Sequence, residues 1–382
     1  MDNLIPPLFN FGTFITLFGL SVSVSGALVL LHLQPASYLR ADEDLKSVQC
    51  AHQRNTPRVG GLGFIAAMLF AFWYLVPGPD HYFFSVFAMT LMPVFLAGLA
   101  EDLGWRVSPL GRMLAAAGSA LLAILLLEVW IPSHAFPGFE MLLGFAPLAI
   151  AITIIWAAGV CHAINLIDGV NGLAGGAGLL IATGLVLVAH KAGAINFAIA
   201  AAAVIPAIIG FLVFNWPMGR IFLGDAGAYS LGHILVWLAI GLAWLHPQVS
   251  ALSLSLMFFW PVADTFLAIY RRARAGRPVS LPDRLHYHQL VMRGLILLSR
   301  GRLGKGTANS ATCIIVLPLI AIPIAMSVYF WDRPVAALVA WAGLGFAFVL
   351  SYIAGIRCLQ KNAWRQVRSA KPAPISLRIT TH

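Results

Sequence analysis

Charged residues are scarce in this 382-residue chain: they make up 10% of it, whereas hydrophobic residues make up 60%. Apolar runs of about eighteen residues or more recur from end to end, and no soluble domain of useful size remains between them. Segments such as SATCIIVLPLIAIPIAMSVYF are apolar on every side, as packing against lipid and against other helices requires. The composition excludes an ordinary soluble protein and predicts an all-α, polytopic integral membrane protein.

Cysteine is also rare. The four cysteines, at positions 50, 161, 313 and 358, show no metal-ligand spacing, so they predict neither disulfides nor a zinc site. The N-terminus lacks a basic segment and a small-residue cleavage pattern, so we expect its first apolar stretch to be a retained signal-anchor helix.

Eleven apolar runs are separated by polar breaks, and each predicts a transmembrane helix. They cover residues 8–33, 60–77, 83–99, 113–131, 143–161, 173–190, 195–214, 229–245, 249–269, 309–330 and 335–356.

The net charge of +10 does not indicate nucleic-acid binding, because the basic residues follow the alternation of loops rather than an aromatic-lined groove. The alternate loops on one side of the membrane contain most of the Lys and Arg residues: four in 34–59, two in 100–112, one in 215–228, nine in 270–308 and six in the tail. The other side receives only Lys191 and Arg333. The positive-inside rule therefore predicts an outside N-terminus, a cytoplasmic C-terminus, one transmembrane domain over residues 1–356 and a basic cytoplasmic tail over 357–382.

Polar, glycine-rich islands all fall on the predicted cytoplasmic side. They are RNTPRVGGLGF at 54–64, AEDLGWRVSPLGR at 100–112, HAINLIDGVNGLAGG at 162–176, NWPMGRIFLGDAGAYSLG at 215–232, and the segment 261–290 with its DRLHYHQL. Because these loops meet at one membrane face, we expect them to form one active site that faces the cytosol.

Each island also has an ordinary structural explanation. Glu101 and Asp102 form an acidic pair of the kind that is usually just solvated, yet Arg112 follows closely, and such a set can hold a metal or a diphosphate. Asp225 is flanked by glycines that would let a ligand approach the backbone; a turn-forming Asp is the alternative. Asp264 lies inside an apolar span, where an ionisable group indicates a functional or structural pairing.

His286 and His288 lie on one side of an extended segment but about 200° apart on a helix, so as a zinc pair they are weak evidence. Asp283 and Arg284 precede them in a basic loop, which favours contact with phosphate.

Taken together, the islands resemble the polyprenyl-phosphate N-acetylhexosamine-1-phosphate transferases of glycosyltransferase family 4. The likeness spans residues 54–294 and joins five motifs in order: TPRVGG, AED, NLIDGVNGLAGG, FLGDAGAYSLG and DRLHYHQL. Three positions depart from the family pattern. Glu101 replaces an Asp, Asn171 replaces an Asp, and Gln289 replaces a His.

The resemblance implies transfer of a sugar 1-phosphate from a UDP-N-acetylhexosamine to polyprenyl phosphate, with release of UMP, at the start of a cell-envelope glycan such as a lipopolysaccharide O-antigen. It implies a multi-pass protein of the bacterial inner membrane and a Mg²⁺ ion, with Mn²⁺ as an alternative, held by Asp168 and Asp225. The implied catalytic residues are Glu101, Asp102, Asp168, Asp225, His286 and His288. The implied substrate-binding residues are Thr56, Arg112, Asn165, Gly169, Asn171, Gly172, Asp283 and Arg284.

Asn165 shares a face with Asp168 if the segment is helical, and Gly169 and Gly172 would let substrate approach the backbone. For Asp102 we favour a positioning role. A phosphate monoester has a second pKa of about 6, so the attacking lipid phosphate is already mostly ionised and leaves a general base little to do.

Two other classes stay open at this point. A transporter would carry polar groups near the bilayer midplane, whereas a non-catalytic relative of the transferases would accommodate the three departures. The sequence names neither the sugar nor the oligomeric state, and a homodimer is compatible with it.

Overall fold

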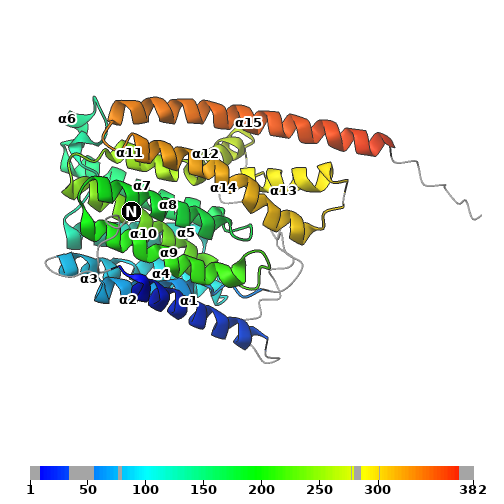
Figure 1. The fold of residues 1–382 in the computed structure, drawn as a ribbon. Coiled ribbons are helices and arrows are strands. Elements are labelled where there is room, and N and C mark those ends of the chain that lie inside the picture. The colour runs from blue at the N-terminus through cyan, green and yellow to red at the C-terminus, as the bar shows by residue number, and fades with distance from the viewer. Residues whose placement is uncertain are drawn as a thin grey trace, which may run out of the picture.

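The computed structural model describes residues 9–33, 56–75, 80–276, 278, 285–300 and 302–369. These residues form α-helices and two short 3₁₀ helices, and no strand occurs among them, which confirms the all-α prediction (Figure 1). The first half comprises α1 (Phe11–His32), α2 (Gly61–Tyr74), α3 (Asp80–Thr90), α4 (Met92–Asp102), α5 (Pro109–Leu127), η2 (Ser133–Ala135), α6 (Glu140–Leu143), α7 (Ala146–Leu166) and α8 (Leu173–Lys191). The second half comprises α9 (Ile195–Asn215), α10 (Gly224–Leu245), α11 (Ala251–Ser255), η3 (Leu256–Phe258), α12 (Phe259–Arg274), α13 (Tyr287–Leu298), α14 (Lys305–Tyr329) and α15 (Pro334–Ser369).

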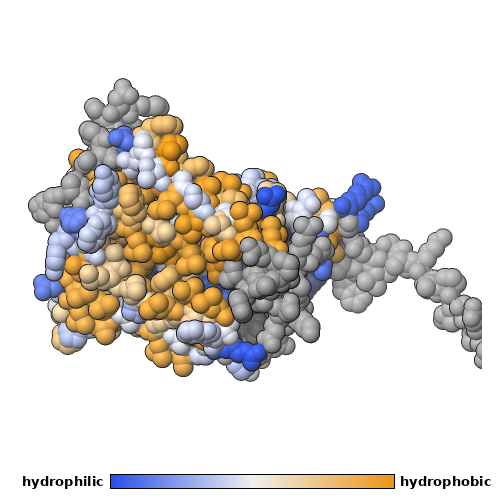
Figure 2. All heavy atoms as spheres, turned by 90° about the horizontal axis from the view of Figure 1, so that it is seen from below, coloured by the Kyte–Doolittle hydropathy of each residue, from blue (hydrophilic) through white to orange (hydrophobic). Residues whose placement is uncertain are grey.

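Within the described residues, 10 segments are long and apolar enough to cross a membrane, and they coincide with predicted spans. The remaining predicted span, 60–77, corresponds to α2, an apolar helix of 14 residues. The face of the bundle shown in Figure 2 is largely hydrophobic, with hydrophilic residues gathered toward its margins. A polytopic membrane protein is therefore the architecture that the structure supports.

The start of α10 and the end of α15 are among the helix ends that differ from the sequence prediction. α10 begins at Gly224 rather than at residue 229, so Asp225 lies in the first turn of a helix and not in a loop. α15 continues to Ser369, past the predicted end at 356, because the polar residues that follow include Arg, Gln and Lys, which are good helix formers. Both errors arose because the prediction ended each span at its first polar residues.

Two predicted spans contain a break. Residues 83–99 divide into α3 and α4 at Leu91, and residues 249–269 divide into α11, η3 and α12. Proline lies in the first turn of the helix after each break, as Pro93 in α4 and Pro261 in α12. Proline is tolerated there because the first N–H groups of a helix have no partner within the helix.

α10 is the central helix of the bundle: every residue from Gly224 to Ala243 is buried. It packs against α7, α4 and α2, and glycines allow the close approach. A Cβ on Gly98 of α4 would lie 2.5 Å from the backbone nitrogen of Ala226, and one on Gly227 would lie 2.5 Å from the Cα of Gly61. The first turn of α10 is thus fixed by backbone contact with two neighbouring helices.

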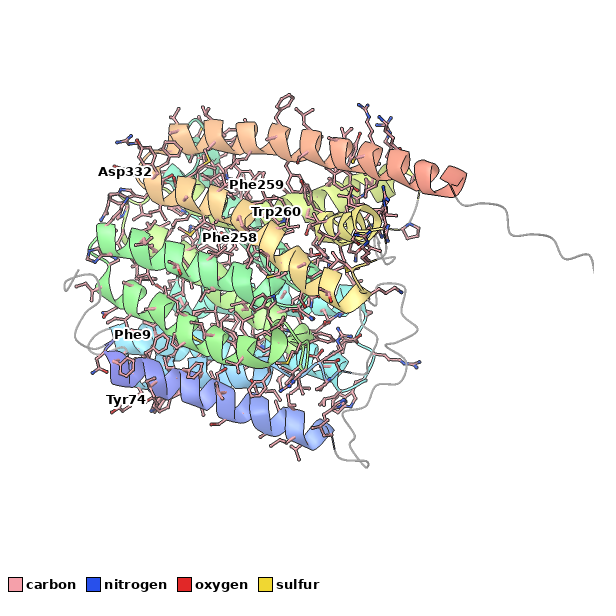
Figure 3. All side chains as sticks on the ribbon, turned by 45° about the vertical axis from the view of Figure 1, so that its right-hand side comes forward. Phe9, Tyr74, Phe258, Phe259, Trp260 and Asp332 are labelled. Atoms are coloured by element: carbon pink, nitrogen blue, oxygen red, sulfur yellow. The ribbon has the colours of Figure 1, made fainter. Side chains whose placement is uncertain are left out.

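An aromatic cluster joins α12 to α15. The ring of Phe259 lies 4.9 Å from that of Trp341, and the ring of Trp260 lies 5.1 Å from that of Phe348. Figure 3 shows Phe259 and Trp260 in the interior of the bundle, below α15. This cluster holds in place the helix that carries Asp264.

The close packing at Gly98 predicts the effect of a single methyl group. We expect Gly98→Ala to lower the thermal unfolding midpoint of the purified protein, because overpacking of this kind costs ~1–3 kcal/mol. Gly118→Ala, on α5, is the matched control, since a Cβ there meets nothing within 4 Å. Equal midpoints for the two variants would contradict the packing account.

Candidate active site

Two carboxylates hold the first turn of α10. Asp102, the last residue of α4, accepts the N–H of Asp225 at 2.9 Å and the N–H of Ala226 at 2.8 Å. Asp168, just beyond α7, accepts the N–H of Gly224 at 3.2 Å. The first N–H groups of a helix lack intrahelical partners and carry positive partial charge, so carboxylates are favourable there. Three of the sequence islands thus meet at one point.

Gly224 is required at this junction. Its φ of +75° lies in the left-handed region, and a Cβ would collide with the carbonyl oxygen of Arg58. The sequence analysis expected the glycines around Asp225 to admit a ligand to the backbone. For Gly224 and Gly227 that expectation is wrong, because the backbones of Arg58 and Gly61 occupy the space.

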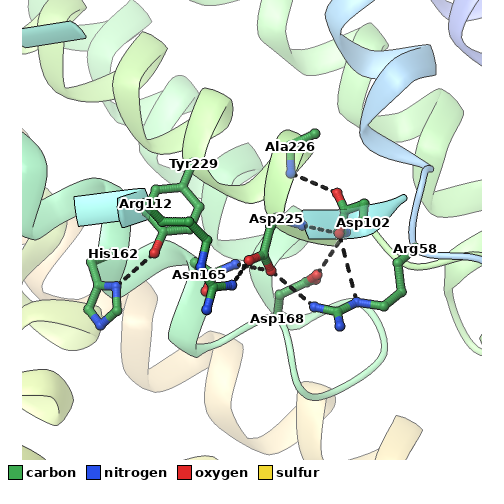
Figure 4. A network of polar contacts seen from close by, with 10 residues as sticks. Arg58, Asp102, Arg112, His162, Asn165, Asp168, Asp225, Ala226 and Tyr229 are labelled. Atoms are coloured by element: carbon green, nitrogen blue, oxygen red, sulfur yellow. Dashed lines mark hydrogen bonds and ion pairs between the residues drawn. The ribbon is translucent and has the colours of Figure 1, made fainter. Parts of the chain in front are cut away.

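The Asp225 carboxylate is held by three side chains from three other elements (Figure 4). Its Oδ1 accepts from Arg58 Nη2 and from Asn165 Nδ2, each at 3.0 Å, and its Oδ2 pairs with Arg112. Arg58 also lies near Asp102, with 3.8 Å between Nε and Oδ1. Asp225 is therefore the point where the charges of the site converge.

The charged cluster of Asp102, Asp168, Asp225, Arg58 and Arg112 can accept more positive charge. Three aspartates face two arginines, and burial raises the pKa of Asp168 to about 7, although Arg58 and the Gly224 N–H oppose that rise. A cation beside Asp168 would favour the ionised carboxylate and lower its pKa again.

Asp168 and Asp225 suit a magnesium ion by the chemistry of their oxygens. Mg²⁺ is usually held by one or two carboxylates together with substrate phosphates and water. Across the described residues, no group of three or more His, Cys, Asp or Glu side chains is placed to hold a metal ion alone. The donor set therefore fits a cation whose coordination is completed by a phosphate of the substrate.

His162 and Tyr229 form a polar pair next to the carboxylate cluster. The Tyr229 hydroxyl lies 2.8 Å from His162 Nδ1. Tyr229 follows Asp225 by four residues on α10, and His162 precedes Asn165 by three on α7, so each lies one helical turn from the carboxylate cluster.

A pair of histidines lies beside the aspartate and arginine cluster. His286 and His288 are both buried at the start of α13, and their rings stack with centroids 5.6 Å apart. His286 is the extended residue before the helix and His288 lies in its first turn, so the two face the same way. A Cβ on Gly169 would lie 3.6 Å from His288 Nε2, which places this ring beside the Asp168–Gly169 turn.

Asn171 and Gly172 connect the turn after α9 to α14. The Asn171 side chain donates to the Pro217 carbonyl oxygen at 3.1 Å, and its N–H donates to Asn309 Oδ1 at 2.8 Å. The carboxylate of an Asp could not donate to this carbonyl, so the contact gives a structural reason for Asn at position 171. Gly172 has a φ of +80°, and a Cβ there would lie 2.7 Å from the Trp216 ring; packing, rather than the expected substrate approach, explains this glycine.

The other predicted residues are more dispersed. The Thr56 hydroxyl donates to the Gly219 carbonyl oxygen at 3.3 Å, at the edge of the site. Glu101 Oε2 is buried, with no hydrogen-bond partner in the part of the chain that the structure describes. Asp283 and Arg284 lie outside the described residues.

Three residues of the site were not predicted from the sequence: Arg58, His162 and Tyr229. Arg58 stands inside the TPRVGG motif, so its position was a signal that could have been used. His162 and Tyr229 each lie one helical turn from an assigned residue, and helical spacing alone would have placed them on the same faces.

A family model described as "Glycosyl transferase family 4" matches residues 83–243. The undecaprenyl-phosphate alpha-N-acetylglucosaminyl 1-phosphate transferase of Yersinia pestis is 28% identical over 326 residues, which cover 84% of this chain and 84% of that protein. The protein of the same description from Escherichia coli K12 is 29% identical over 63% of this chain and 66% of its own length. A probable undecaprenyl-phosphate N-acetylglucosaminyl 1-phosphate transferase of Bacillus subtilis is 28% identical over 65% of this chain and 69% of its own length.

The contacts of Asp102 predict a difference between two neighbouring carboxylates. Asp102→Asn replaces one acceptor oxygen with an NH₂ group facing a backbone N–H, and an unsatisfied buried group costs ~1–3 kcal/mol. We therefore expect a lower thermal unfolding midpoint for this variant. Glu101→Gln is the matched control and should leave the midpoint close to wild type. A larger loss for Glu101→Gln would show that the helix cap has been assigned to the wrong carboxylate.

Proposed function

The chain belongs to glycosyl transferase family 4, and from that premise we propose that it transfers a sugar 1-phosphate from a UDP-sugar to undecaprenyl or another polyprenyl phosphate. An oxygen of the lipid phosphate attacks the phosphorus that carries the sugar. The bond from that phosphorus to the bridging oxygen of UMP breaks, and polyprenyl-diphospho-sugar and UMP are formed.

The observation that carries this proposal is the convergence of Asp102, Asp168 and Asp225 with Arg58 and Arg112 at one end of an apolar bundle. A prenyl chain must stay in hydrocarbon, whereas a nucleotide-sugar comes from water. A charged site at the end of membrane-spanning helices lets both substrates meet.

The two arginines counter the charge of the substrates. Both substrates are anionic, and guanidinium groups form strong, directional hydrogen bonds with phosphate oxygens. The Arg58 side chain is 35% exposed and that of Arg112 is 16% exposed, so both can contact a ligand while they pair with Asp225. Part of the catalysis then comes from electrostatic stabilisation and alignment.

We assign a resident Mg²⁺ ion to Asp168 and Asp225. When bound, the ion would neutralise the diphosphate and stabilise the leaving UMP. Asp102 has a different task, because both of its oxygens accept N–H groups of α10. It positions Asp225, in keeping with the limited need for a general base when the attacking phosphate has a second pKa of about 6.

The sugar that we propose is N-acetylglucosamine, which the descriptions of the Yersinia, Escherichia and Bacillus relatives name. The product would begin a cell-envelope glycan. We place the site on the cytoplasmic side of a bacterial inner membrane, because the basic residues cluster in the loops at that end of the helices.

The transporter alternative loses its main support. Asp264, the ionisable residue on which the transporter alternative was based, lies with His286 at the start of α13 and beside the site, rather than alone in the middle of the bundle. The non-catalytic alternative is separated from the transferase by an activity measurement.

The first assay is UMP release by purified protein supplied with undecaprenyl phosphate, Mg²⁺ and a panel of UDP-sugars. We expect release with UDP-N-acetylglucosamine, loss of release with chelator, and its return when Mg²⁺ is restored. Asp225→Asn should abolish release, because it removes a proposed metal ligand and the counter-charge of Arg58 and Arg112. No release with any donor, from protein shown to be folded, would favour the non-catalytic alternative.

A labelling experiment tests the orientation. In a background without native cysteines, Trp105→Cys marks the site end of the bundle and His134→Cys marks the opposite end; both native side chains are exposed. A membrane-impermeant maleimide should label His134→Cys in cells with a permeable outer envelope, and Trp105→Cys only after the inner membrane is opened. The reverse pattern would place the site outside the cell.

A further inference from the structure

Asp264 is a buried carboxylate whose hydrogen bonds and ion pairs, within the described part of the chain, all lead to the histidine segment. Its side chain is 1% exposed on α12. Oδ1 accepts the N–H of Tyr287 at 2.9 Å, and Oδ2 lies 3.0 Å from His286 Nδ1 and 3.7 Å from His288 Nδ1. One carboxylate therefore caps α13 and faces the same nitrogen of both imidazole rings.

Residues 285–287 of the histidine segment make further contacts with α12 and α15. The Tyr287 ring packs against Trp260 with centroids 4.8 Å apart, and its hydroxyl lies 3.2 Å from Ser351 Oγ. The Tyr352 hydroxyl donates to the Leu285 carbonyl oxygen at 2.9 Å. These contacts to α12 and α15 fix the backbone, so the carboxylate of Asp264 is left to set the orientation of the rings.

The orientation of the rings determines which atoms meet a ligand. When Nδ1–H of a neutral imidazole donates to a carboxylate, Nε2 is the ring nitrogen that remains available, and it is an acceptor. The Nε2 atoms of His286 and His288 are both buried, and neither has a hydrogen-bond partner among the residues that the structure describes. His288 Nδ1, at 3.7 Å from Asp264, also has none there, so the His288 ring is placed by its stacking on His286. Buried polar atoms are normally satisfied, so two such atoms side by side indicate a ligand that supplies their partners.

The position of His288 indicates which part of a ligand this would be. Its Nε2 lies beside Gly169, and Gly169 follows Asp168, the residue proposed to hold the metal and diphosphate. A group that contacts both the diphosphate region and these rings carries phosphate oxygens and hydroxyls. In a UDP-sugar, that group is the sugar 1-phosphate, the part that is transferred.

We propose that Asp264 is a positioning residue: it fixes His286 by a hydrogen bond, and with it the stacked His288 ring, so that the Nε2 atoms accept hydroxyl groups of the sugar 1-phosphate part of the donor. This inference rests on the proposed function. Asp264 itself touches no substrate and acts through the two rings.

Asp264→Asn separates the orienting role from the structural one. The Asn oxygen can still accept from the Tyr287 N–H and cap α13, but its NH₂ group would face His286 Nδ1 as a second donor. The imidazole must then turn, or move its proton to Nε2, which converts Nε2 from an acceptor of a sugar hydroxyl into a donor. We expect affinity for UDP-N-acetylglucosamine, measured by titration calorimetry, to fall about 10–100-fold, the range seen when a metal-ligating histidine loses the group that orients it.

Two further readouts should stay near wild type for Asp264→Asn. UMP lacks the sugar and its phosphate, so its affinity should not change. The thermal unfolding midpoint should not fall as it does for Asp264→Ala, which loses the cap as well. Asp264→Glu retains the carboxylate and should recover part of the donor affinity.

A glycine pair provides an independent test. Gly169→Ala places a methyl group 3.6 Å from His288 Nε2, an ordinary contact that the fold can accept but that occupies the space in front of the ring. It should weaken binding of the UDP-sugar and not of UMP. Gly159→Ala on α7 is the control, because a Cβ there meets nothing within 4 Å.

The outcomes are distinguishable. Wild-type donor affinity in Asp264→Asn, with lost stability in Asp264→Ala, would reduce Asp264 to a helix cap and overturn the proposal. An equal loss of UMP affinity in Asp264→Asn would place the rings against the nucleotide and also overturn it. Failure of the wild-type protein to release UMP would instead refute the proposed function, while the binding measurements would still decide the role of Asp264.

Discussion

The site depends on the need to satisfy the N-terminus of α10 inside an apolar bundle. A buried helix end has N–H groups that water cannot reach, and leaving them without partners is costly. Asp102 and Asp168 satisfy three of them, and in doing so they tie the ends of α4 and α7 to α10. The same contacts bring Asp225 between Arg58 and Arg112. A structural requirement thus assembles the charged groups.

In this arrangement, the carboxylates that hold the fold differ from the groups that are available to a ligand. Asp102 has both oxygens bound to the backbone of α10. Asp225 is bound instead by the side chains of Arg58, Asn165 and Arg112, and the Asp168 carboxylate accepts one backbone N–H, in a group of charges that can still take a cation. The histidine segment shows the same division, since Asp264 holds the rings and the Nε2 atoms face inward. In each group, a buried carboxylate fixes the groups that are available to a ligand.

The sequence was sufficient to predict the helical membrane fold and to place Asp102, Asp168 and Asp225 at one face, because apolar runs and polar islands are local patterns. It could not predict that Arg58 and Arg112 pair with the same aspartate, since that depends on how α2, α5 and α10 pack. For the same reason, the sequence did not show whether each glycine faces a ligand or packs against the protein. Gly224 and Gly172 contact protein rather than ligand, and only the neighbouring helices reveal this.

The most direct test of the account is calorimetric titration of UDP-N-acetylglucosamine into the wild-type protein and Asp225→Asn, each with and without Mg²⁺. The account predicts that Mg²⁺ tightens binding to the wild type and has no such effect on Asp225→Asn, because the cation and the diphosphate share this carboxylate. Equal affinity of the wild type with and without the cation, or equal tightening in both proteins, would contradict it.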